Sequence, residues 1–204
     1  MKRLFLSSLF KNVTKLFIEF AAENLEGKTV AYIPTAANHE KIDFHVRHTQ
    51  KVLLKMGLTV DELDISTAQY ADIKEKLQRD DYIYVGGGNT FFLLQEMIRT
   101  GAGDIVKQQI EQGKIFIGES AGSILLAPNI EYSSDMDNPE AAPDLHSYDG
   151  LNMIDFYPLP HINDLTQRKA IKSITVKYES LIPLIPITNS QAILVTGTEK
   201  QIVG

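Results

Sequence analysis

The 204-residue chain contains no cysteine. This absence excludes disulfide bonds, zinc sites built on cysteine thiolates and a cysteine nucleophile. The chain also lacks an uncharged apolar run as long as a membrane-spanning helix requires. It has no basic run, and its formal net charge of −6 disfavours nucleic acid as a partner, because a mildly acidic surface repels phosphates. The lack of cysteine fits a reducing compartment, and we expect a cytoplasmic location.

The first ten residues begin with basic side chains and continue with apolar ones, as the start of a signal peptide does. Lys11 and Lys15 interrupt this run, and no small-residue cleavage site follows it. We therefore interpret residues 2–7 as a short first strand. A chain of this length, with 44% hydrophobic and 23% charged residues, is typical of a single domain with one sizeable core, here residues 1–204.

Apolar periodicity predicts alternating strands and helices over the first 125 residues. Expected strands cover 2–7, 29–33, 58–65, 82–85 and 114–117, and expected helices cover 10–24, 41–56, 68–79, a segment from 90, 104–112 and a segment just after 120. This alternation predicts a parallel sheet covered by helices on both faces, with ligands bound at the carboxyl ends of the strands. After Pro128 we expect an acidic loop over 129–150, an extended stretch over 152–160, a helix over 167–179 and edge hairpins over 185–203.

The run Gly118-Glu119-Ser120-Ala121-Gly122 lies between an apolar strand and the start of a helix. In a nucleophile elbow, flanking glycines allow the sharp turn that exposes the serine hydroxyl, and the next backbone N–H can face a developing oxyanion. The alternative is a serine that only caps the following helix. Both interpretations stay open from this motif alone.

A second glycine-rich turn, Gly86-Gly87-Gly88-Asn89, follows the neighbouring strand. Its backbone N–H groups offer a second oxyanion donor or an anion site. The alternative is a tight turn with Asn89 or Thr90 as helix cap. No lysine follows in the P-loop arrangement, and the dinucleotide-binding spacing is absent.

A serine nucleophile needs a base, and His161 is our first choice because it follows Leu159-Pro160 at the end of an extended stretch. The pair His45 and His48 has helical spacing that suits a metal, although a solvated helix face is the commoner explanation. His39 follows a strand and could line a pocket, and His146 lies in the acidic loop. The carboxylates of that loop are the candidates for orienting the base: Glu131, Asp135, Asp137, Glu140, Asp144 and Asp149.

Three ordered motifs together resemble the dipeptidase E (α-aspartyl dipeptidase) family, with cyanophycinase as a more distant relative. They are residues 84–91 (YVGGGNTF), 118–122 (GESAG) and 159–161 (LPH), and the resemblance extends over nearly the whole chain. It implies a flavodoxin-like three-layer α/β fold with a mostly parallel central sheet, similar to class I glutamine amidotransferases. Those proteins use a cysteine, which this chain lacks.

The resemblance also implies a triad of serine, acid and histidine without a cofactor or metal. Ser120 falls on the nucleophile and His161 on the base, and residues 134–136 resemble the acid segment, which makes Asp135 the expected third member. Backbone N–H groups of Gly88 and Ala121 are the implied oxyanion donors, with Gly87 and Asn89 as neighbouring substrate-binding residues.

The sequence thus predicts a serine peptidase of short peptides, with N-terminal Asp-X dipeptides as the implied substrate. The segment between His161 and the next helix is shorter than the basic insertion of dipeptidase E, which favours a second hypothesis of a broader short-peptide exopeptidase or esterase. A third hypothesis is a non-catalytic module that binds an anion at residues 86–89. We expect a short peptide as partner, neither nucleic acid nor membrane, and a homodimer as one option.

Overall fold

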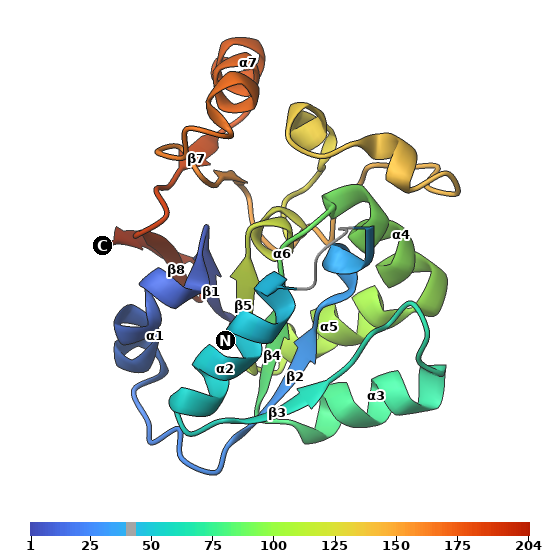
Figure 1. Cartoon of the computed structure of the whole chain (residues 1–204), viewed down its shortest axis with the longest axis vertical. Helices are drawn as coiled ribbons and strands as arrows, with labels where there is room; N and C mark the ends of the chain where they lie inside the picture. Colours follow the sequence, from blue (N-terminus) through green and yellow to red (C-terminus); the bar gives the residue numbers. More distant parts are fainter. Residues whose placement is uncertain (40–43) are drawn as a thin grey trace.

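The computed structural model describes residues 1–39 and 44–204 and contains a seven-stranded sheet flanked by helices (Figure 1). The strands of this sheet are β1 (Arg3–Ser7), β2 (Thr29–Ile33), β3 (Thr59–Glu62), β4 (Tyr82–Val85), β5 (Ile115–Glu119), β8 (Ala192–Thr196) and β9 (Glu199–Val203). The helices are α1 (Thr14–Ala21), α2 (Phe44–Lys55), α3 (Tyr70–Arg79), α4 (Thr90–Thr100), α5 (Ala102–Glu111), α6 (Ala121–Ile124) and α7 (Arg168–Tyr178).

The strand order is β3-β2-β4-β5-β1-β8-β9, and the five strands from β3 to β1 run parallel. Only β8 and β9 at one edge are antiparallel. Since parallel strands end at the same edge, this order brings the residues that follow β1, β2, β4 and β5 to one place. The two glycine-rich turns, after β4 and β5, therefore lie side by side.

Apolar side chains on each face of the sheet form a separate core. Phe5, Tyr32 and Tyr84 face α1 and α2, where Phe17 and Leu53 are fully buried. On the other face, strand residues such as those at 4, 6, 83, 85 and 116 pack on α3, α4, α5 and α6. Near-continuous burial of both faces explains why the strands β1, β4 and β5 are apolar at nearly every position. The three-layer α/β fold that we expected is confirmed.

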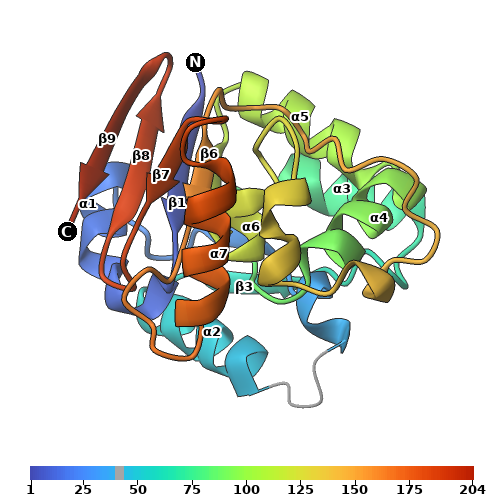
Figure 2. The ribbon, with the colours of Figure 1, turned by 90° about the horizontal axis from the view of Figure 1, so that it is seen from above.

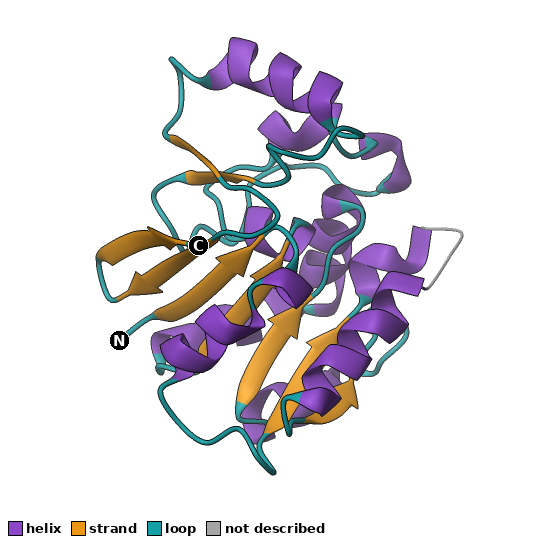
Figure 3. Ribbon diagram, turned by 60° about the vertical axis from the view of Figure 1, so that its left-hand side comes forward, coloured by secondary structure: helices purple, strands orange, loops and turns teal. Residues whose placement is uncertain are grey.

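Most of the segment 129–187 lies beyond the carboxyl ends of the parallel strands (Figures 1 and 2), whereas residues 151–156 run back along the core to Lys2, at the amino end of β1. The segment 129–150 includes two short 3₁₀ helices, η3 (Glu131–Asp135) and η4 (Pro139–Ala141), so it is more ordered than the loop we expected. Helix α7 lies against η3. The strands β6 (Tyr157–Leu159) and β7 (Leu184–Pro186) pair in parallel as a separate two-stranded sheet (Figure 3).

Most expected elements are present with boundaries shifted by a few residues. The helix expected over 10–24 is divided into a 3₁₀ turn, η1 (Phe10–Asn12), and α1. The start of the helix expected over 41–56 lies outside the described residues, and its remainder is α2. The terminal hairpin is β8 and β9, whereas β7 pairs with β6 instead of joining a hairpin. Within the described ranges, no helix combines the length and apolarity needed to cross a bilayer.

Candidate active site

Ser120 occupies the turn between β5 and α6 in a strained backbone conformation. Its φ of 50° and ψ of −109° lie in a region that non-glycine residues rarely adopt. The turn is held because the Ser120 N–H donates to the carbonyl of Ser7 at the end of β1 over 2.9 Å. The Ser120 side chain caps no backbone N–H of α6. The helix-cap interpretation is therefore wrong, and the elbow geometry is present.

His161 directs its imidazole at this serine. Its Nε2 lies 2.8 Å from Ser120 Oγ, within the range expected of a nucleophile and its base. The His161 backbone also has a positive φ of 66°, and its N–H donates to Ser8 Oγ over 3.1 Å. Because both backbones are fixed by the residues that end β1, the sheet edge itself positions the pair.

The second imidazole nitrogen contacts an amide side chain rather than a carboxylate. His161 Nδ1 lies 2.8 Å from Oδ1 of Asn189, in the turn before β8. This oxygen accepts the Nδ1 proton, which leaves Nε2 as the acceptor toward Ser120. The Asn189 Nδ2 group faces Asp164 Oδ2 at 3.5 Å, and the Asn189 N–H donates to Asn163 Oδ1 over 2.8 Å. The contact with Asp164 favours the amide orientation in which Oδ1 faces His161, and the backbone contact holds the turn that carries Asn189.

Asp135 does not contact His161, contrary to the expected triad. Its Oδ2 accepts a hydrogen bond from Lys177 Nζ on α7 over 2.7 Å, and this bond together with one from Ser173 lowers the pKa of Asp135. The ordered 3₁₀ turn η3 directs Asp135 toward α7. The position facing His161 Nδ1 is taken by Asn189, a residue that sequence analysis treated only as part of a turn.

Of the other loop carboxylates, Asp137 lines the same cavity as Ser120 and His161, where it contacts the start of α4. Asp137 accepts hydrogen bonds from the N–H, over 3.0 Å, and the hydroxyl of Thr90, and it thereby supports the start of α4. Asp149 accepts from Ser147 and Asn129. The remaining members of the set, Glu131, Glu140 and Asp144, are exposed. No sequence signal distinguished Asn189, because a polar turn 28 positions after the histidine resembles any surface turn.

The glycine turn after β4 lies against the serine. A Cβ atom at Gly87 would stand 3.2 Å from the Cβ of Ser120, and one at Gly88, where φ is 136°, would collide with the Ala36 carbonyl oxygen at 2.2 Å. In the part of the chain that the structure describes, the Gly88 N–H and the Ala121 N–H donate no hydrogen bond to a protein group. Asn89 is a helix cap: its Oδ1 accepts from Phe92 N–H over 2.9 Å, and its Nδ2 donates to the Asn138 carbonyl.

Ser120 and His161 open into a cavity of about 240 Å³ at the carboxyl ends of β1, β2, β4 and β5. Its wall includes Gly87 and Gly88 from the glycine turn, Glu119 beside the serine, and His48 from α2. The side chains of His39 and His45 lie outside the described part of the structure, so the metal interpretation of the 45/48 pair is not addressed by it. His146 is exposed. Within the described residues, no group of three or more potential ligands is arranged to hold a metal ion.

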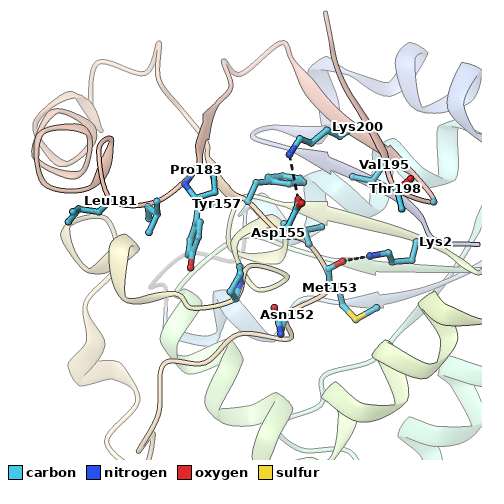
Figure 4. Close-up of a pocket in the computed structure, with 15 residues that line it drawn as sticks. Lys2, Asn152, Met153, Asp155, Tyr157, Leu181, Pro183, Val195, Thr198 and Lys200 are labelled. Atoms are coloured by element: carbon cyan, nitrogen blue, oxygen red, sulfur yellow. Dashed lines mark hydrogen bonds and ion pairs between the residues drawn. The ribbon is translucent and has the colours of Figure 1, made fainter.

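A larger hollow of about 650 Å³ lies between the β8–β9 hairpin and the segment that leads into β6 (Figure 4). Its charged groups are engaged with one another or with the wall: Lys2 donates to the Met153 carbonyl over 2.8 Å, and Lys200 faces Asp155 at 3.5 Å and the Phe156 ring at 4.9 Å. Neither Ser120 nor His161 lines it. We therefore place the chemistry in the smaller cavity.

The fold and the site together define a three-layer α/β protein with a serine and a histidine paired at a strand-to-helix elbow, an arrangement typical of serine hydrolases. A family model described as peptidase family S51 matches residues 4–203, and the chain belongs to this family. It is a peptidase.

Similar proteins from other organisms agree with this assignment. An uncharacterized peptidase of Listeria monocytogenes is 47% identical over 199 residues, which cover 98% of this chain and 97% of the relative. An uncharacterized peptidase of Pasteurella multocida is 46% identical, covering 100% and 98% of the two chains. A crystal structure of a Listeria monocytogenes protein named as a candidate peptidase E superimposes with a TM-score of 0.95 at 45% identity, covering 100% of this chain and 98% of that one.

Proposed function

We propose that this peptidase hydrolyses short peptides through an acyl-enzyme formed on Ser120. The observation that carries the proposal is the 2.8 Å contact between Ser120 Oγ and His161 Nε2 at a strained elbow. His161 removes the hydroxyl proton as Ser120 attacks the peptide carbonyl, and it then donates that proton to the leaving amine. Water hydrolyses the ester in a second step of the same kind.

Two further groups complete the proposed machinery. Asn189 holds the imidazole in the tautomer that accepts the serine proton, the role that a carboxylate has in the common triad. The N–H groups of Gly88 and Ala121 bind the oxyanion. Two observations support this role: both residues lie beside Ser120, and within the described residues neither N–H donates a hydrogen bond to a protein group. This mechanism requires no metal.

The test of the mechanism is Ser120→Ala, assayed on a library of dipeptides and tripeptides. We expect a loss on the order of 10⁶ in kcat, as for other serine nucleophiles. A fluorophosphonate should label the wild-type protein and fail to label the variant. Equal cleavage by both proteins would overturn the mechanism.

The same library measures the breadth of specificity. Only residues 162–167 separate His161 from α7, and this short connection favours a broad exopeptidase over one restricted to N-terminal aspartate. We expect cleavage of several dipeptides at comparable rates. A preference of about 100-fold or more for Asp-X, equivalent to about 2.7 kcal/mol, would instead support the narrower aspartyl dipeptidase.

A further inference from the structure

The residue before the nucleophile, Glu119, is a buried carboxylate that the proposed hydrolysis does not use. The residue is 9% exposed, and it lines the cavity that contains Ser120. Because Glu119 and Ser120 line one cavity of about 240 Å³, a molecule bound there can contact both residues.

Three donors from three different elements hold this carboxylate. Glu119 Oε1 accepts from the Phe10 N–H in η1 over 2.8 Å, and Oε2 accepts from the Tyr84 hydroxyl on β4 over 2.7 Å and, more weakly, from the Thr49 hydroxyl on α2 at 3.5 Å. Burial, reinforced by the charge of Glu119, raises the pKa of Tyr84, so this phenol stays protonated and donates. A carboxylate offers about four acceptor positions, and one therefore remains.

Lys11 and His48 line the same cavity as Glu119. Among the residues whose side chains the structure describes, no lysine or arginine forms an ion pair with Glu119. Buried carboxylates are normally paired with a cation, because leaving water is costly for an unpaired charge. A cation that enters the cavity with the substrate would supply the missing partner.

We infer that Glu119 binds the free α-ammonium group of the N-terminal residue of the substrate. In a peptide whose first bond is cleaved, this nitrogen is two bonds from the attacked carbonyl carbon, or about 2.5 Å away. A carboxylate that lines the same small cavity as the nucleophile is placed to bind that nitrogen. The inference rests on the proposed function and narrows its substrates to peptides with an unblocked N-terminus, cleaved after the first residue.

The test compares an aminoacyl p-nitroanilide that carries a free amino group with its N-acetyl derivative, using the amino acid that the wild-type protein cleaves fastest. A charge-assisted hydrogen bond contributes about 1.5–3 kcal/mol, so we expect wild-type kcat/KM to favour the free amine by about 10- to 150-fold. Glu119→Gln should lose most of this preference by losing activity on the free-amine substrate alone. Fluorophosphonate labelling of Ser120 in the variant should stay within about threefold of the wild-type rate, because neither reacting group is changed.

Two control variants separate recognition of the amine from support of the cavity wall. Tyr84→Phe removes a donor to Glu119 from the buried side but keeps the carboxylate, and it should keep the preference for the free amine. Glu199→Gln removes one negative charge from the exposed face of β9 and should change nothing. In Glu119→Gln, the amide can still accept from Phe10, and the rotatable Tyr84 hydroxyl can accept in turn.

Each outcome has one meaning. Equal wild-type cleavage of the free and acetylated substrates overturns the inference without needing any variant, while labelling of Ser120 leaves the hydrolytic mechanism intact. A parallel loss of labelling and of both activities in Glu119→Gln also overturns it, since that pattern indicates support of the elbow. Absence of labelling in the wild-type protein instead contradicts the proposed function itself.

Discussion

At the scale of single residues, the site consists of side chains whose roles depend on one another. Ser120 is strained, His161 is strained, and both are tied to residues 7 and 8 at the end of β1. Strained backbones of this kind cost about 1–3 kcal/mol each and persist only where the surroundings fix them. The surroundings here are the sheet edge and the turn that carries Asn189.

Replacing Asn189 tests its role as a positioning residue. Asn189→Ala removes the acceptor for His161 Nδ1–H, so we expect kcat to fall by about 10²–10⁴ as the imidazole loses its tautomer and orientation. Asn189→Asp, which keeps an acceptor, should recover much of the activity. The measurement is peptide hydrolysis together with the rate of fluorophosphonate labelling, which should fall and recover in parallel.

Asp135→Asn is the matched control for this experiment. Because Asp135 pairs with Lys177 on α7 and does not contact His161, kcat should stay within about threefold of wild type. A large loss in Asp135→Asn with full activity in Asn189→Ala would restore Asp135 as the acid of the triad.

At the scale of elements, the elbow depends on a close approach between β4, β5 and α6. A Cβ atom at Gly122 would lie 2.1 Å from the Val85 carbonyl oxygen, and one at Gly118 would lie 2.7 Å from the Gly122 carbonyl oxygen. These two glycines are therefore needed for packing as well as for the turn. The motif thus needs glycine for close packing at 118 and 122, and it needs serine for the nucleophile at 120.

Gly122→Ala should separate α6 from β4. We expect a loss of about 1–3 kcal/mol in the free energy of unfolding, the usual cost of overpacking, and slower labelling of Ser120. Chemical denaturation and the labelling rate measure the two effects. Gly27→Ala is the comparison: its φ is also positive, at 78°, but the added methyl meets nothing within 4 Å, so labelling should be unchanged.

At the scale of the whole molecule, Asp64 joins the segments that follow β2 and β3. Its carboxylate accepts from Thr35 over 2.8 Å, Asn38 over 3.0 Å and Ser66 over 2.7 Å. Burial alone would raise the pKa of Asp64, but the hydrogen bonds from Ser66, Thr35 and Asn38 outweigh it and lower the pKa. The folded protein therefore binds this proton less readily than the unfolded chain does.

This difference predicts a contribution to acid unfolding. The stabilisation from Asp64 is complete above the unfolded-chain pKa of about 3.9 and is lost as the pH falls through the lower pKa of the folded state. Asp64→Asn should lower the denaturation midpoint near pH 7, and the gap to wild type should narrow as the pH falls below about 4. Asp155→Asn, at a position 88% exposed, is the control and should follow the wild-type curve. A gap that stays constant with pH would contradict the assignment.

Several features of this protein follow from the sequence alone. Alternation of apolar strands and amphipathic helices predicts the parallel sheet, because burial on both faces requires apolar strands. The strand-to-helix position of residues 118–122 predicts the elbow, since its glycines and serine are neighbours in the chain. The proline-preceded histidine was found by the same local reasoning, and the structure places it 2.8 Å from the serine.

Only the tertiary structure decided which groups stand behind these local motifs. Asp135 was the expected partner of His161, but an ordered 3₁₀ turn directs it to Lys177, and Asn189 approaches from a turn that β8 brings beside β1. The Glu119 carboxylate is likewise held by hydrogen bonds from three donors, which lie on η1, β4 and α2. Contacts between segments far apart in the chain depend on the packing of whole elements, which leaves no local pattern in the sequence.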